Sequence, residues 1–88
     1  MKPKVDPKYH QRYVALGSYI ALMRKQMDMN QDAFAEFCGV GTSTISSLEA
    51  PKEDKTCTLD TLFRIADALG VDVTDMLSFE LPKPGKTS

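Results

Sequence analysis

Apolar side chains recur along most of this chain at intervals of three and four residues. The longest such series comprises Tyr9, Tyr13, Leu16, Ile20, Met23 and Met27. Positions spaced in this way lie on one stripe of a helix. The strict alternation of apolar and polar residues that marks a half-buried strand is not found over any length. The pattern therefore predicts an all-α fold.

Residues that favour helix ends divide the chain into five helices. Asp, Asn and Thr cap helix N-termini, and Gly often follows the last residue of a helix. Starts are expected at Asp6-Pro7, Asn30, Thr58 and Asp72, and ends at Gly39 and Gly70. A turn at Val40 separates the second helix from a third, which starts at Gly41 or Thr42.

Each predicted helix has an apolar face that would join a common core. The expected members are Leu16, Ile20, Phe34, Ala35, Cys38, Ile45, Leu48, Leu59, Leu62, Ile65, Ala66 and Leu69. A chain of 88 residues, of which 42% are hydrophobic, is long and apolar enough to form one small domain. We place this domain at residues 13–80, and we expect residues 81–88 to form a flexible tail.

Residues 1–12 form a basic N-terminal extension with two possible structures. Tyr9 and Tyr13 either extend the first helix or belong to a separate segment that is broken near Gly17, since glycine weakens a helix. The sequence leaves both alternatives open.

The charges are unevenly distributed. Residues 1–29 carry six bases and two acids, whereas residues 30–49 carry three acids and no Lys or Arg. The net charge of the whole chain is −1, which does not by itself indicate an anionic partner. The basic N-terminal part is the exception, and it is the region that would contact such a partner.

Composition argues against several classes of protein. Two cysteines and one histidine without close ligand spacing make a zinc site an unlikely expectation, and lone thiols fit a reducing cytoplasm. No apolar run is as long as a membrane span. We also find no combination of nucleophile, base and orienting group. We therefore expect no enzyme activity, no metal, no cofactor and no membrane association.

Two long segments resemble the Cro and phage-repressor type of helix-turn-helix protein, the XRE family. They are "LGSYIALMRKQMDMNQDAFAEFCGVGTSTISSLE" and "LDTLFRIADALGVDVTDML", and the resemblance covers roughly residues 13–77. It implies a compact five-helix Cro/phage-repressor-like domain in which helices 2 and 3 form the helix-turn-helix. It also implies a cytoplasmic protein that binds double-stranded DNA and regulates transcription.

The resemblance implies roles for particular residues. The third helix would lie in the major groove and the N-terminus of the second would face a phosphate. The implied DNA contacts are Gln31, Thr42, Ser43, Ser46, Ser47, Lys52 and Lys55, with Lys2, Lys4 and Lys8 as further phosphate contacts. Arg24 and Glu49 would form an ion pair that sets the angle of the third helix.

Two features depart from the family pattern. Ala50-Pro51-Lys52 stands where the family commonly has Asn-Gly-Lys, so a phosphate-binding Asn is missing. Phe37 takes a position that is usually charged and exposed. It is either a lone exposed aromatic residue, which is common, or part of a patch that binds a partner.

Partner predictions follow from the apolar residues left over near the C-terminus. We expect a homodimer that binds an inverted repeat as a repressor. Its interface is placed at Val73, Met76, Leu77 and Phe79, with Val71 and Leu81 as neighbours. A surface around Tyr9 and Tyr13 is the rival interface. The alternative function is an antitoxin that binds a toxin and represses its own operon.

Overall fold

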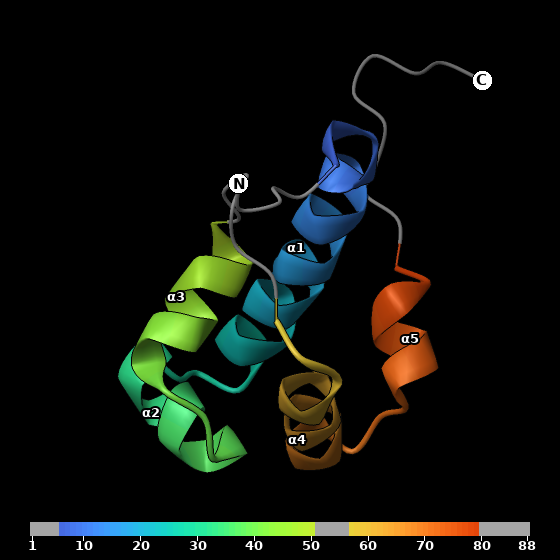
Figure 1. The fold of residues 1–88 in the computed structure, drawn as a ribbon. Helices are drawn as coiled ribbons and strands as arrows, with labels where there is room; N and C mark the ends of the chain where they lie inside the picture. The colour runs from blue at the N-terminus through green and yellow to red at the C-terminus, as the bar shows by residue number, and fades with distance from the viewer. Residues whose placement is uncertain (1–5, 51–56, 80–88) are drawn as a thin grey trace, which may run out of the picture.

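The fold was analysed in a computed structural model that describes residues 6–50 and 57–79. The described chain is helical and contains no strand. A 3-10 turn (η1, Pro7–Tyr9) leads into five helices, which are α1 (His10–Gln26), α2 (Gln31–Cys38), α3 (Thr42–Glu49), α4 (Leu59–Leu69) and α5 (Val73–Leu77). Figure 1 shows α1 in the centre, with α2 and α3 on one side and α5 on the other. The predicted all-α, five-helix fold is confirmed.

Most predicted caps act at the helix ends as expected. The Oδ1 atom of Asn30 accepts a hydrogen bond from the N–H of Ala33 at 2.8 Å, and the hydroxyl of Thr58 accepts one from Thr61 at 3.2 Å. Gly39 and Gly70 end α2 and α4 with φ angles of 77° and 72°. Glycine adopts this left-handed backbone without the steric cost that a Cβ atom imposes.

The first helix is longer than the helix-turn-helix unit requires. Asp6 accepts a hydrogen bond from the N–H of Lys8 at 3.0 Å and so caps η1, and α1 then continues unbroken through Gly17. The break near Gly17 that the sequence left open is not present: Tyr13 lies within α1, and Tyr9 ends the η1 turn that leads into it.

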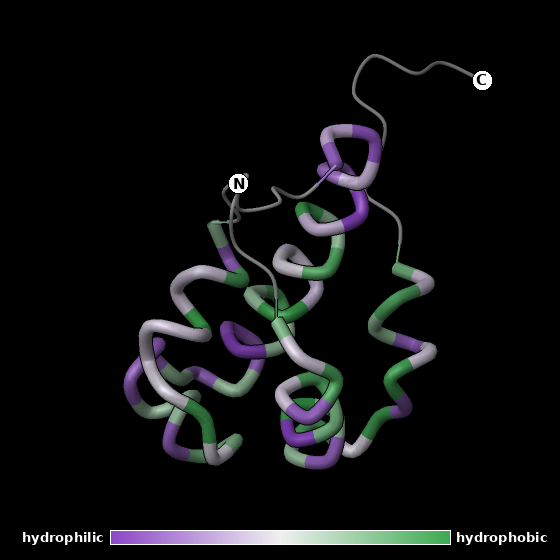
Figure 2. The backbone as a smooth tube through the Cα atoms, viewed as in Figure 1, coloured by the Kyte–Doolittle hydropathy of each residue, from purple (hydrophilic) through white to green (hydrophobic). Residues whose placement is uncertain are grey.

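One core joins all five helices. Its buried members are Leu16, Ile20, Phe34, Ala35, Cys38, Ile45, Leu48, Leu62, Ile65, Ala66 and Met76. Figure 2 shows the corresponding apolar bands interrupted by polar ones along each helix. The prediction was wrong for Leu59, which is 63% exposed. Leu59 is the first residue of α4, and at that position the helix turns its side chain away from the core.

Gly17 is the point of closest approach between α1 and α3. A Cβ atom on this residue would overlap the carbonyl oxygen of Leu48 and lie 2.9 Å from its carbonyl carbon. The backbone of α3 therefore occupies the space that any other side chain at position 17 would need. This explains a mid-helix glycine that local helix propensity disfavours.

We expect Gly17→Ala to destabilise the protein although alanine is the better helix former. The added methyl group must push α3 away from α1, and overpacking of this kind costs about 1–3 kcal/mol. Urea unfolding of the two proteins measures the difference. Ala21→Gly, one turn later on α1, is the reverse control and should cost only about 1 kcal/mol of helix propensity. A more stable Gly17→Ala variant would show that the two helices are not in contact here.

Candidate nucleic-acid interface

The helices α2 and α3 are joined by a three-residue turn, Gly39-Val40-Gly41. The N–H of Val40 donates to the carbonyl of Ala35 at 3.0 Å, which closes the end of α2. Gly41 then has an extended backbone and accepts hydrogen bonds from Thr44 and Ile45 at 3.1 and 3.3 Å, so that α3 starts at Thr42. The turn fixes the direction of α3 relative to α2.

Helix α3 has an apolar inner face and a hydroxyl-rich outer face. Ile45 is fully buried and Leu48 is 6% exposed. On the other side Thr42, Ser43 and Ser46 are exposed, whereas Ser47 is half-buried. The structure therefore brings three of the four predicted contact residues of α3 onto one open surface. Ser47 lies at its edge.

The N-terminus of α2 is the second feature of the helix pair that could contact an anion. The side chain of Asn30 satisfies the N–H of Ala33, while the N–H groups of Gln31 and Asp32 precede the first α-helical hydrogen bond. Free N–H groups and the helix dipole make such an end favourable for an anion. Asp32 opposes this effect, because its carboxylate lies in the same first turn.

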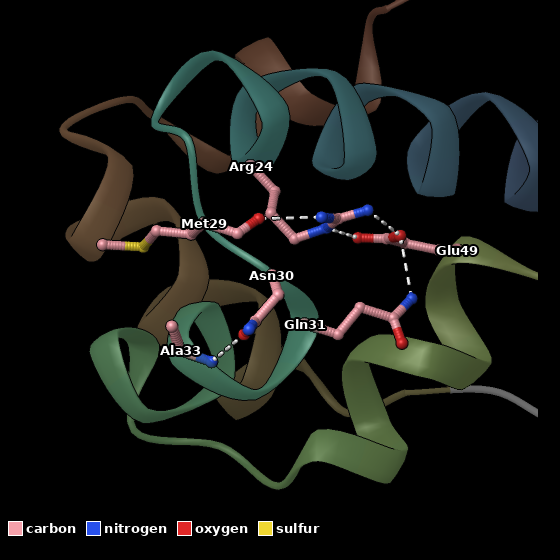
Figure 3. A network of polar contacts seen from close by, with 6 residues as sticks. All are labelled: Arg24, Met29, Asn30, Gln31, Ala33 and Glu49. Atoms are coloured by element: carbon pink, nitrogen blue, oxygen red, sulfur yellow. Dashed lines mark hydrogen bonds and ion pairs between the residues drawn. The ribbon is translucent and has the colours of Figure 1, made fainter.

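Three side chains from α1, α2 and α3 form a polar network between α1 and the helix pair (Figure 3). Arg24 donates from Nε and Nη2 to the two carboxylate oxygens of Glu49, at 2.8 and 3.0 Å. Its Nη1 donates to the carbonyl of Met29 at 2.8 Å. Gln31 donates from Nε2 to Oε1 of Glu49 at 3.0 Å. The network holds the end of α3 against the end of α1 and the start of α2.

The network is largely shielded from water. The side chains of Arg24 and Glu49 are 12% and 9% exposed. Burial raises the pKa of the Glu49 carboxyl, but the hydrogen bonds from Arg24 and Gln31 and the charges of Arg24 and Lys25 outweigh it, so the pKa lies below its ordinary value. The hydrogen bond to Glu49 raises the pKa of Arg24. Both groups are therefore ionised at neutral pH.

Gln31 has a role that the sequence did not indicate. One N–H of its amide group donates to Glu49, which braces the end of α3. The second N–H and the amide oxygen remain for other partners, so the contact with DNA expected of Gln31 stays a prediction.

Lys25 is a basic residue that we did not select from the sequence. It lies in the last turn of α1, next to Arg24, and it is exposed. Its charge contributes to lowering the pKa of Glu49. Asp28, Asp32 and Glu36 are exposed acids. Lys8 is exposed in η1, whereas Lys2, Lys4, Lys52 and Lys55 lie outside the described residues.

The predicted dimer residues of α5 do not form one exposed face. Met76 is 1% exposed and belongs to the core, which corrects its placement in the interface. Its side chain lies on the inner side of α5, within the core that joins the helices. Val73 is half-buried, and the ring of Phe79 packs on that of Tyr19 at 5.4 Å. Leu77 remains exposed, at 58%.

The described residues were also searched for reactive thiols, metal sites and membrane-spanning helices. Burial raises the pKa of the Cys38 thiol to about 11 and also raises that of Cys57, so both stay protonated and poorly reactive. Residues 6–50 and 57–79 contain no group of His, Cys, Asp and Glu side chains suited to a metal. In the same residues, no helix is both long and apolar enough to span a membrane.

A short helix pair joined by a glycine turn, with the outer face of its second helix free, defines the helix-turn-helix class of DNA-binding domains. The three remaining helices pack around this pair as in Cro and C1-type regulators. The chain belongs to the helix-turn-helix family HTH_3, whose model matches residues 20–76. Comparison with curated proteins gives no match.

Solved structures with the same fold include three bacterial proteins. A hypothetical transcription factor NHTF from Neisseria aligns with a TM-score of 0.69 and 23% identity, over 90% of this chain and 88% of that one. The clp gene regulator ClgR from C. glutamicum aligns with 0.62 and 27%, over 75% and 83%. An HTH_3 family transcriptional regulator from Vibrio cholerae aligns with 0.63 and 22%. That match covers 73% of this chain but only 35% of the Vibrio cholerae protein.

Proposed function

We propose that this protein is a sequence-specific transcriptional regulator, a repressor that binds an inverted repeat in double-stranded DNA as a homodimer. The observation that supports it best is the exposed hydroxyl face of α3, held in place by Arg24, Gln31 and Glu49. A helix used only for packing does not need such bracing around an open polar face.

The outer face of α3 suits direct but modest base recognition. A threonine methyl group packs on the methyl of thymine, and serine hydroxyls donate to or accept from base edges, often through water. Thr42 and Ser43 stand in the first turn of α3, which enters the groove deepest. None of these side chains makes the bidentate contact of Arg with guanine, so sequence-dependent DNA shape adds to the specificity.

The phosphate contacts come from outside the recognition helix. We assign them to the N-terminus of α2 and to Lys25, with Lys8, Lys52 and Lys55 as further contributors. Lys25 and the start of α2 lie next to the same ion pair and would meet one DNA strand. This arrangement explains how a helix pair without a Lys or Arg residue can bind a polyanion.

Selection of bound sites from random DNA tests the proposal directly. The purified protein should enrich a two-fold symmetric site. Enrichment of no sequence at all would remove the proposal and favour the antitoxin alternative. Co-purification with the product of a neighbouring gene would then be the next measurement.

We expect Thr42→Ala and Ser43→Ala to reduce specificity while leaving the melting temperature unchanged. Each should lower the ratio of specific to random DNA binding by about 1–2 kcal/mol, because an exposed hydroxyl group contributes to base reading and not to the core. Ser47→Ala should have a smaller effect. Thr74→Ala, an exposed threonine on α5, is the control. An unchanged ratio in both α3 variants would mean that this face does not read DNA.

We expect the affinity to be salt-sensitive to a modest degree. A dimer that neutralises about 3–6 phosphates has a log–log slope of roughly −3 to −5. Lys25→Ala should weaken binding to every sequence alike and reduce the slope by about two units per dimer. Arg12→Ala, near the opposite end of α1, should leave the slope unchanged. Titrations at several salt concentrations measure this, and equal slopes for the wild type and Lys25→Ala would exclude Lys25 as a phosphate contact.

A further inference from the structure

Two large apolar side chains lie uncovered on α4. Leu59 is 63% exposed and Phe63 is 54% exposed. They are four residues apart, so they are neighbours on one side of the helix. Together they form an apolar stripe, which we call the α4 stripe.

The α4 stripe lies on the fourth helix, outside the helix-turn-helix pair of α2 and α3. Arg64 marks the side of α4 that faces α2, since its Nη1 atom is 3.5 Å from the carbonyl oxygen of Gly39 at the end of α2. Successive residues of a helix are offset by about 100°, and Phe63 therefore points to a different side. Figure 1 shows α4 between α2 and α5.

We propose that a second copy of this chain docks on the α4 stripe, with the two α4 helices antiparallel about a two-fold axis. This inference rests on the proposed function, which requires a homodimer, and it names the surface. A two-fold interface must be complementary to itself. In this arrangement Leu59 of each copy packs on Phe63 of the other.

The charges beside the stripe fit this arrangement. Asp60 and Arg64 follow the two stripe residues along the same flank, and their side chains are 73% and 54% exposed. Within one chain they pair at 2.8 Å. Between antiparallel helices, the same flank of one copy faces the same flank of the other. The Asp60 of each copy then lies opposite the Arg64 of its partner, giving two ion pairs around the apolar contact. In a parallel two-fold pair the two flanks would lie on opposite sides of the contact, and these ion pairs between the copies would not form.

The first test removes the aromatic contact. Phe63→Ser should weaken dimerisation at least about tenfold in sedimentation equilibrium, because large interface aromatics commonly contribute this much. Phe37→Ser, which removes an exposed phenylalanine of α2, is the matched control and should leave dimerisation unchanged. Melting curves should show that both variants stay folded. An undiminished dimer in Phe63→Ser overturns the inference.

The second test reverses the charges beside the stripe, and its result depends only on contacts between the two copies. Asp60→Arg makes the flank wholly positive, and Arg64→Asp makes it wholly negative. Each variant alone should dimerise more weakly than the wild type. An equimolar mixture should recover dimers, because every ion pair between the copies is then restored while the pair within each chain remains repulsive. A mixture no better than its components contradicts the antiparallel arrangement.

The outcomes separate this inference from the proposed function. Suppose that the wild type dimerises and selects a symmetric site, while all three α4 variants dimerise as it does. Then the α4 stripe is excluded and the repressor function stands. A wild type that is monomeric even with its selected DNA overturns both the stripe and the homodimer. Loss of dimerisation and of cooperative binding to the symmetric site in Phe63→Ser supports both.

Discussion

Ile45→Ala should lower the free energy of unfolding by about 2–5 kcal/mol, the largest effect expected from a single substitution in this protein. Ile45 is fully buried on the inner face of α3, within the core that joins the helices. Its truncation loses apolar contacts and leaves a cavity. A domain of this size has a total stability of roughly 4–13 kcal/mol, so the variant would be at the edge of folding.

Thermal and urea unfolding measure this effect. For a domain of this size the melting temperature should fall by at least about 8 °C. Ser46→Ala, the next residue along α3 and an exposed one, is the control and should unfold like the wild type. A shift of similar size in both variants would mean that α3 does not have the two faces seen here.

Arg24→Met should be the second most destabilising change. It keeps the aliphatic length of the side chain but leaves the carboxylate of Glu49 without its cationic partner. Removing one member of a fully buried pair costs about 3–5 kcal/mol, and the partial exposure of this pair reduces our expectation to about 2–3 kcal/mol at pH 7. Arg12→Met, on the exposed part of the same helix, should have almost no effect.

The cost of Arg24→Met should depend on pH in a specific direction. In the folded wild type the pKa of Glu49 lies below its ordinary value of 4.5. The ion pair therefore contributes its full stability above pH 4.5, and that stability is lost as the pH falls through the folded pKa. In the variant the carboxylate keeps Gln31 and the charge of Lys25 but loses Arg24, so burial raises its pKa relative to the wild type and protonation reduces the cost of the buried charge. The difference between the two proteins should thus shrink on acidification, and a difference that is constant from pH 7 to pH 3 would contradict the assignment to Glu49.

These two variants should affect DNA binding by different routes. Ile45→Ala lowers the folded fraction, whereas Arg24→Met releases the end of α3 in a molecule that is still folded. Specific binding measured on fully folded protein at low temperature should therefore fall more in Arg24→Met. We therefore expect the network of Arg24, Gln31 and Glu49 mainly to orient the recognition helix, while its net contribution to stability is secondary.

The sequence alone determined the helices and most of the core. Caps such as Asn30 and Thr58 and terminators such as Gly39 and Gly70 act on neighbouring residues, so their effect can be read locally. The same holds for Ile45 and Leu48, because helical spacing already assigns them to the inner face. The resemblance of two long segments to the helix-turn-helix family covered these elements in order.

Only the tertiary structure decided how distant residues combine. Gly17 interrupts a helical pattern in the sequence, but in the fold it lets Leu48 approach α1. Gln31, which we predicted to contact DNA, also donates to Glu49 and so braces α3. Helical periodicity gives the side of a helix on which a residue lies, but not which helix packs against that side. For this reason the exposure of Leu59 and the burial of Met76 could not be read from the sequence.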